Sequence, residues 1–152
     1  MKTETEIKQI SIYKLSIPLK KPFVISLGPI YNADNIVVTI KTVGGLTGTG
    51  ECSPFMTING ESQATCFEVG QYLAQGLKGK DATAIEDNHA IMDKIIYANT
   101  SIKSAFDMAM YDIASQQAGQ PLYKFLEGKK NKKIITDYTI SLGDADEMAQ
   151  HA

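Results

Sequence analysis

The first third of the chain alternates hydrophobic and polar positions with the period of two that is typical of β-strands. The range Ile7–Ile17 alternates partially, with apolar side chains on both faces. The range Asn35–Thr42 alternates more cleanly, with Ile36, Val38 and Ile40 on one face. A Gly-Gly pair then supplies the positive-φ turn of a hairpin, and Leu46–Cys52 returns as a third strand. We therefore predict a three-stranded antiparallel meander.

Beyond residue 62 the hydrophobic period changes to that of amphipathic α-helices. Three apolar stripes at helical spacing follow one another, and the third ends before a glycine and a proline that stop a helix. The stripes are Cys66, Val69, Leu73 and Leu77, then Ile85, His89, Met92 and Ile96, then Ile102, Ala105, Phe106, Ala109 and Ile113. A run of strands followed by a run of helices predicts an α+β fold.

Two irregular segments interrupt the pattern. Lys20–Ala33 contains two prolines and Gly28, and its length predicts a functional loop in place of a simple turn. Ser53–Glu61 carries Phe, Met and Ile between a strand and a helix. Two interpretations of this second segment stay open, since its apolar groups either fill the domain's own core or form a lid over an apolar ligand.

The end of the chain reads as the beginning of another domain. After Gly128 a lysine-rich connector leads to a predicted strand, Lys133–Leu142, and Asp144 can cap a helix that has barely begun at Ala152. We therefore divide the chain into residues 1–128 and 129–152. The last strand would have two unpaired edges, so we expect it to be unpaired, swapped or mobile, and formation of a homo-oligomer stays open.

Composition narrows the function classes. The 152 residues are 43% hydrophobic with a net charge of −2, which suits one sizeable core. All 15 basic residues are lysines without a basic stripe, so nucleic acid is not an expected partner. No apolar run is long enough for a signal peptide or a membrane span, and Cys52 and Cys66 read as reduced, buried thiols. These features predict a cytoplasmic protein without a membrane partner.

The residues by themselves define no catalytic constellation. The glycines of Gly48-Thr49-Gly50-Glu51 lack the spacing of a phosphate-binding loop, and we interpret them as strand positions that let another backbone approach closely. His89 lies on an apolar stripe, where a lone histidine is usually a hydrogen-bonded core residue. The serines lack a histidine in a recognisable nucleophile context.

Several motifs in fixed order nevertheless carry a resemblance over essentially the whole chain. They are KPFVISLG, GTGECSPFMTINGES, SAFDMAMYDIASQQAGQPLYKFLEG and TDYTISL. In this order they resemble the N-terminal capping domain of the mandelate racemase and muconate-lactonising branch of the enolase superfamily, and most of all the dipeptide epimerases, the group that includes L-Ala-D/L-Glu epimerase. The resemblance implies a capping domain over residues 1–128. Residues 129–152 would be the linker, first strand and first helix start of an incomplete (β/α) barrel.

The resemblance also implies a Mg²⁺-dependent isomerase that moves a proton at the α-carbon of a dipeptide. In such sites a metal held by carboxylates stabilises the enolate and a lysine on each side exchanges the proton. Those residues come from later strands of a barrel of roughly 250 residues. We therefore assign no catalytic residue and no metal ligand to this chain, and we expect it to be inactive alone. Alternatives are a muconate cycloisomerase or o-succinylbenzoate synthase-like activity, or a non-catalytic binding module.

Substrate-binding positions can be carried over from the same resemblance. The first capping loop matches Lys21–Gly28, the second matches Phe55–Gly60, and the first barrel strand reaches the mouth of the active site. Members that prefer an acidic side chain carry an arginine where this chain has Gly28, which predicts a preference for small or apolar dipeptides. The predicted substrate-binding residues are Phe23, Ile25, Gly28, Met56, Thr57, Ile58 and Thr139.

Overall fold

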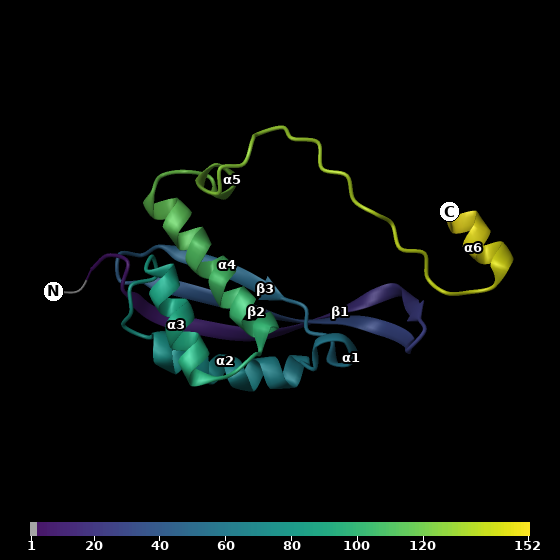
Figure 1. The fold of residues 1–152 in the computed structure, drawn as a ribbon, viewed down its shortest axis with the longest axis horizontal. Coiled ribbons are helices and arrows are strands. Elements are labelled where there is room, and N and C mark those ends of the chain that lie inside the picture. Colours follow the sequence, from purple (N-terminus) through teal and green to yellow (C-terminus); the bar gives the residue numbers. More distant parts are fainter. Residues whose placement is uncertain (1–2) are drawn as a thin grey trace. The chain divides into compact units, whose positions relative to one another are not determined.

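A computed structural model describes residues 3–152 and confirms the α+β fold (Figure 1). Three strands come first and the helices follow, as the change of period predicts. The strands are β1 (Ile7–Ile25), β2 (Gly28–Thr42) and β3 (Thr47–Cys52). The helices are α1 (Met56–Asn59), α2 (Gln63–Leu77), α3 (Ile85–Ile95), α4 (Thr100–Gln117), α5 (Leu122–Phe125) and α6 (Ala145–His151).

The three strands form one sheet in the order β1-β2-β3. β2 and β3 are antiparallel, with Ile36 opposite Cys52 and Ile40 opposite Gly48. Ile36, Val38 and Ile40 are completely buried, so the predicted inward face of β2 is confirmed. The connecting turn has Gly45 at φ +91°, a conformation that glycine adopts without the steric cost of a side chain.

The prediction of a long loop over Lys20–Ala33 was wrong. β1 continues to Ile25 and β2 begins at Gly28, so only two residues separate the strands. Prolines usually demote a strand because they cannot donate to the ladder. Here β1 is an edge strand, and the pairing of β2 with β3 reaches only as far as Ile36. Pro18, Pro22 and Pro29 therefore each have one neighbouring strand at most. The missing donor does not interrupt the hairpin at these positions.

Helix α4 forms the centre of the helical layer. It packs against β3 and against α2 and α3, and it lies across the strands in Figure 1. A Cβ at Gly48 would clash with the carbonyl oxygen of Ala109, and one at Gly50 would clash with that of Ala105. The two glycines therefore let the helix backbone approach the strand, which confirms their structural interpretation. The predicted inward stripe of α4 is completely buried.

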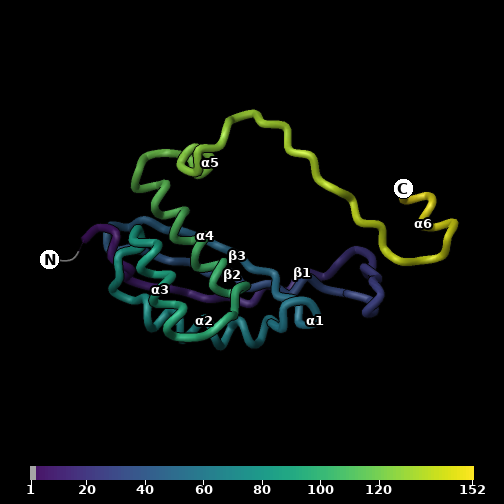
Figure 2. Tube along the Cα trace, in the orientation of Figure 1, coloured from purple at the N-terminus to yellow at the C-terminus, as the bar shows by residue number. Residues whose placement is uncertain are grey.

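The chain divides into two compact units, and each is described by itself. The first contains the residues up to Leu15 together with Asp34–Lys130, and the second contains Ser16–Ala33 together with Asn131–Ala152. The predicted strand Lys133–Leu142 does not form. Residues 132–141 follow an extended trace (Figure 2) and have no strand partner. Ile134 is 85% exposed. An extended segment becomes a strand only through the ladder of a neighbour. The predicted capping of the last helix is confirmed, since the Asp144 carboxylate accepts from the amides of Asp146 and Glu147.

Candidate functional site

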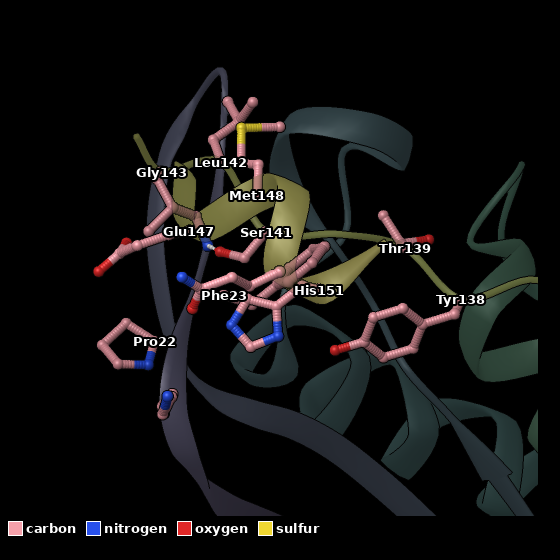
Figure 3. Close-up of a pocket in the computed structure, with 13 residues that line it drawn as sticks. Pro22, Phe23, Tyr138, Thr139, Ser141, Leu142, Gly143, Glu147, Met148 and His151 are labelled. Carbon is pink, nitrogen blue, oxygen red and sulfur yellow. Dashed lines mark hydrogen bonds between the residues drawn. The ribbon is translucent and has the colours of Figure 1, made fainter. Parts of the chain in front are cut away.

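A cavity of about 550 Å³ lies within the second unit. Its walls are the end of β1, the segment Tyr138–Gly143 and helix α6 (Figure 3). Two hydrogen bonds hold these walls together. The Val24 amide donates to Ser141 Oγ at 2.8 Å, and the Leu142 amide donates to the Val24 carbonyl oxygen at 2.9 Å.

Two of the predicted substrate-binding residues meet in this cavity and two others of the same unit do not. Phe23 and Thr139 both line it, although they are more than a hundred residues apart in the sequence. Ile25 and Gly28 lie nearby in the chain but outside the lining. Gly28 has φ +117°, a region that L side chains rarely adopt, and open space surrounds the position where its Cβ would be.

The second predicted loop, in the first unit, contains the short helix α1, which the sequence did not predict. None of its residues is buried, and Met56 and Ile58 are 64% and 74% exposed. Thr57 between them is also exposed. The interpretation in which these side chains fill the domain's own core is therefore wrong for α1. An apolar pair that faces solvent on a short helix is available to contact a ligand or another surface.

A buried carboxylate directly follows this loop. Glu61 is 6% exposed, and its side chain accepts hydrogen bonds from the backbone amides of Ser101 at 3.0 Å and Ile102 at 3.4 Å. These amides belong to the first turn of α4, whose donors have no partner inside the helix. Sequence reasoning missed Glu61 because its partners lie forty residues away and no local motif marks the pairing.

The two cysteines lie beside Glu61. Cys66 Sγ donates to Glu61 Oε2 at 3.3 Å, and both thiols are free and buried. Burial raises the pKa of Cys52 to about 11. Burial, and then the hydrogen bond to Glu61, raise the pKa of Cys66 further. Both thiols are therefore neutral at physiological pH and unsuited to nucleophilic catalysis, in agreement with the sequence prediction of reduced, buried cysteines.

Two pairs of charged or titratable side chains connect α3 and α4. His89 Nε2 lies 2.6 Å from Asp107 Oδ1, so the histidine has the hydrogen-bonded role that its position predicts, although it is only partly buried. Lys103 Nζ lies 2.8 Å from Asp93 Oδ1, and this contact lowers the pKa of Asp93. These pairs flank a small cavity of about 300 Å³.

The described part of the chain offers neither a cluster of metal ligands nor a membrane-spanning helix. Residues 3–152 contain no group of three or more His, Cys, Asp or Glu side chains that could hold a metal ion. Within the same residues, no helix is long and apolar enough to cross a membrane. The described residues therefore provide no Mg²⁺ site of their own.

The fold and the exposed loop define a class of protein. They combine a three-stranded meander, a helical layer and an exposed apolar loop at the strand–helix junction. Residues 7–127 match the family model described as the mandelate racemase / muconate lactonizing enzyme, N-terminal domain. The chain belongs to this family.

Within this family, the chain is similar to several dipeptide epimerases. The chain is 55% identical over 146 residues to a D-Ala-D/L-Ala epimerase of Cytophaga hutchinsonii, covering 96% of this chain and 40% of the relative. It is 40% identical to a hydrophobic dipeptide epimerase of Enterococcus faecalis, covering 97% and 41%. A crystal structure of a Cytophaga hutchinsonii dipeptide epimerase, complexed with Mg and D-Ala-L-Val, superposes with a TM-score of 0.93 at 54% identity, covering 96% of this chain and 40% of that one. The chain thus spans about 40% of the length of these relatives.

Proposed function

We propose that this chain is the substrate-capping portion of a Mg²⁺-dependent dipeptide epimerase that moves a proton at the α-carbon of a dipeptide. The observation that carries the proposal is the alignment of 96% of the chain with a dipeptide epimerase at 55% identity. The exposed apolar pair Met56 and Ile58 supports it, because a capping loop needs side chains that are free to contact substrate.

The proposed reaction divides substrate binding, by this chain, from proton transfer, by the rest of the enzyme. Removing a weakly acidic α-proton needs an electrophile and a base, and delivering a proton to the other face needs a second base in its protonated form. Bound Mg²⁺ would stabilise the negative charge that develops on the substrate carboxylate or carbonyl. We assign the metal ligands and the bases to a barrel domain that begins in residues 129–152. The present residues bind and orient the dipeptide and exclude water.

The substrate preference follows from the character of the capping residues. Phe23, Ile25, Met56 and Ile58 offer apolar contact, and Thr57 and Thr139 offer hydroxyl groups. The chain contains no arginine, and Gly28 provides no cation for a carboxylate side chain. We therefore propose that the enzyme favours small or apolar dipeptides over those with an acidic side chain, and that it works in the cytoplasm.

The experiment is a dipeptide library assay on the intact natural polypeptide, scored by incorporation of solvent deuterium at the α-carbon. Ala-Ala and Ala-Val should exchange with a kcat/KM at least about tenfold higher than that of Ala-Glu. In a hydrophobic pocket the carboxylate of the glutamate side chain would have no partner. Faster turnover of Ala-Glu than of Ala-Ala would refute the preference. Turnover of no dipeptide at all would refute the epimerase assignment itself.

A further inference from the structure

The exposed loop needs a support that its own packing does not provide. Helix α1 has four residues, none of them buried, so its apolar side chains do not hold it in place. A four-residue helix is also far below the length at which a helix is stable alone. Beyond the buried Pro54 and the half-buried Phe55 that precede it, its position therefore depends on hydrogen bonds to neighbouring elements.

Asn59, the last residue of α1, provides the first of these bonds. Its Oδ1 accepts from the backbone amides of Phe55 at 3.2 Å and Glu61 at 3.0 Å, which are the two ends of the loop. Its Nδ2 donates to Ser101 Oγ at 2.7 Å, which lies on α4. One side chain thus closes the loop on itself and attaches it to a long helix.

Glu61 provides the second attachment, at the same end of α4. Asn99 occupies the N-cap position without a side-chain cap bond, and the amides that a cap normally satisfies are those of Ser101 and Ile102. The Glu61 carboxylate accepts from both of them and is oriented favourably at the positive end of the helix dipole. Because Glu61 is buried, this carboxylate cannot exchange its partners for water without the loop moving.

The turn before α4 is strained in a way that suits this arrangement. Ala98 and Asn99 both have φ +54°, and the left-handed region is uncommon for residues other than glycine. Consecutive residues of this kind persist only where the surrounding structure fixes them. These two residues lead directly into the first turn of α4, whose amides donate to Glu61.

We propose that Asn59 and Glu61 are positioning residues that hold the capping loop on the N-terminus of α4, and so place Met56 and Ile58 for contact with the dipeptide. The proposal rests on the proposed function for the identity of the ligand. The attachment itself rests only on contacts within the first unit. Neither residue touches substrate in this account; each acts through the loop that it holds.

The first test measures the loop directly, by hydrogen exchange of peptides covering residues 55–61 in the intact polypeptide. Asn59→Ala removes all three bonds of that side chain, and Ser101→Ala removes only the link to α4. Each should accelerate exchange, by about tenfold or more for Asn59→Ala, because local opening becomes easier. Ser104→Ala is the matched control, because Ser104 is another serine of α4 whose hydroxyl donates to the Ser101 carbonyl oxygen and not to the loop. Unchanged exchange in Asn59→Ala would overturn the attachment.

The second test separates positioning from mere stability. In Asn59→Ala and Glu61→Gln, KM for an apolar dipeptide should rise about tenfold while kcat changes by less than about threefold, because binding is lost and the bases lie elsewhere. Asn59→Asp, which keeps the acceptor for Phe55 and Glu61, should recover part of the loss. A KM equal to that of Ser104→Ala, despite faster loop exchange, would overturn the positioning role. Absence of epimerase activity in the unsubstituted enzyme would instead refute the proposed function, and the exchange measurement would still decide the attachment.

Discussion

The two predicted capping loops are held by different physical means. The first, Lys21–Gly28, is the tip of a β-hairpin and is ordered by the strands that lead into it. The second, Phe55–Gly60, has no ladder and is attached by the side chains of Asn59 and Glu61 to a helix forty residues away. In a sheet, many backbone hydrogen bonds share the work of fixing a loop. In the second loop, a few hydrogen bonds of two side chains do so. The second loop is therefore the one that single substitutions can release.

The largest loss of stability should come from disrupting the contact between β3 and α4, the helix to which the second loop is attached. Gly50→Ala introduces a Cβ that clashes with the carbonyl oxygen of Ala105, so β3 and α4 must separate. We expect a loss of at least about 3 kcal/mol in the free energy of unfolding, because neither backbone can yield locally. Urea denaturation measures it. Thr49→Ala, an exposed neighbour on β3, is the control, and an equal loss in both variants would contradict the close approach of strand and helix.

A smaller loss should follow removal of the buried carboxylate. Glu61→Ala leaves the amides of Ser101 and Ile102 without their acceptor and should lower the free energy of unfolding by about 2 kcal/mol. Glu68→Ala removes an exposed glutamate from α2 and should change it by less than about 0.5 kcal/mol. If thermal or urea denaturation finds the two variants equally stable, Glu61 does not cap α4.

The buried thiols of Cys52 and Cys66 should make the stability of the fold depend on pH in the alkaline range. Cys52 has its pKa raised from 9.0 to about 11 by burial, so between these values the unfolded chain loses a proton that the folded chain keeps. This thiol therefore contributes nothing below pH 9 and lowers stability as pH rises from about 9 to 11. Denaturation midpoints across that range should fall less steeply in a Cys52→Ala, Cys66→Ala double variant. An unchanged slope would show that the thiols titrate normally.

The smallest effect on stability concerns the hairpin loop. Gly28→Arg places a side chain at φ +117°, which should cost about 1 kcal/mol, while open space lets the guanidinium extend. If the first loop faces the dipeptide, the variant of the intact enzyme should raise kcat/KM for Ala-Glu relative to Ala-Ala. Gly28→Ala carries a similar backbone strain without the charge and serves as the control. No change in the ratio would remove Gly28 from the substrate-binding set.

The sequence predicted most of the first unit because its signals are local. The alternation of Ile36, Val38 and Ile40 and the stripe from Ile102 to Ile113 each identify an element and its buried face. The sequence wrongly predicted a loop over Lys20–Ala33 because prolines often interrupt strands. Whether a proline does so depends on how many neighbouring strands its own strand pairs with. The sequence also placed a strand over Lys133–Leu142 and expected it to be unpaired, swapped or mobile, and the structure shows this segment without a neighbouring strand to supply a ladder.

By itself, the sequence determined the order of strands and helices and the close approach that Gly48 and Gly50 permit. Periodicity and residue size are properties of neighbouring positions, so they can be read along the chain. Only the tertiary structure decided that Glu61 caps α4, that Asn59 attaches the loop to it and that Phe23 and Thr139 line one cavity. These contacts join residues far apart in the sequence, and which distant groups meet is settled by packing.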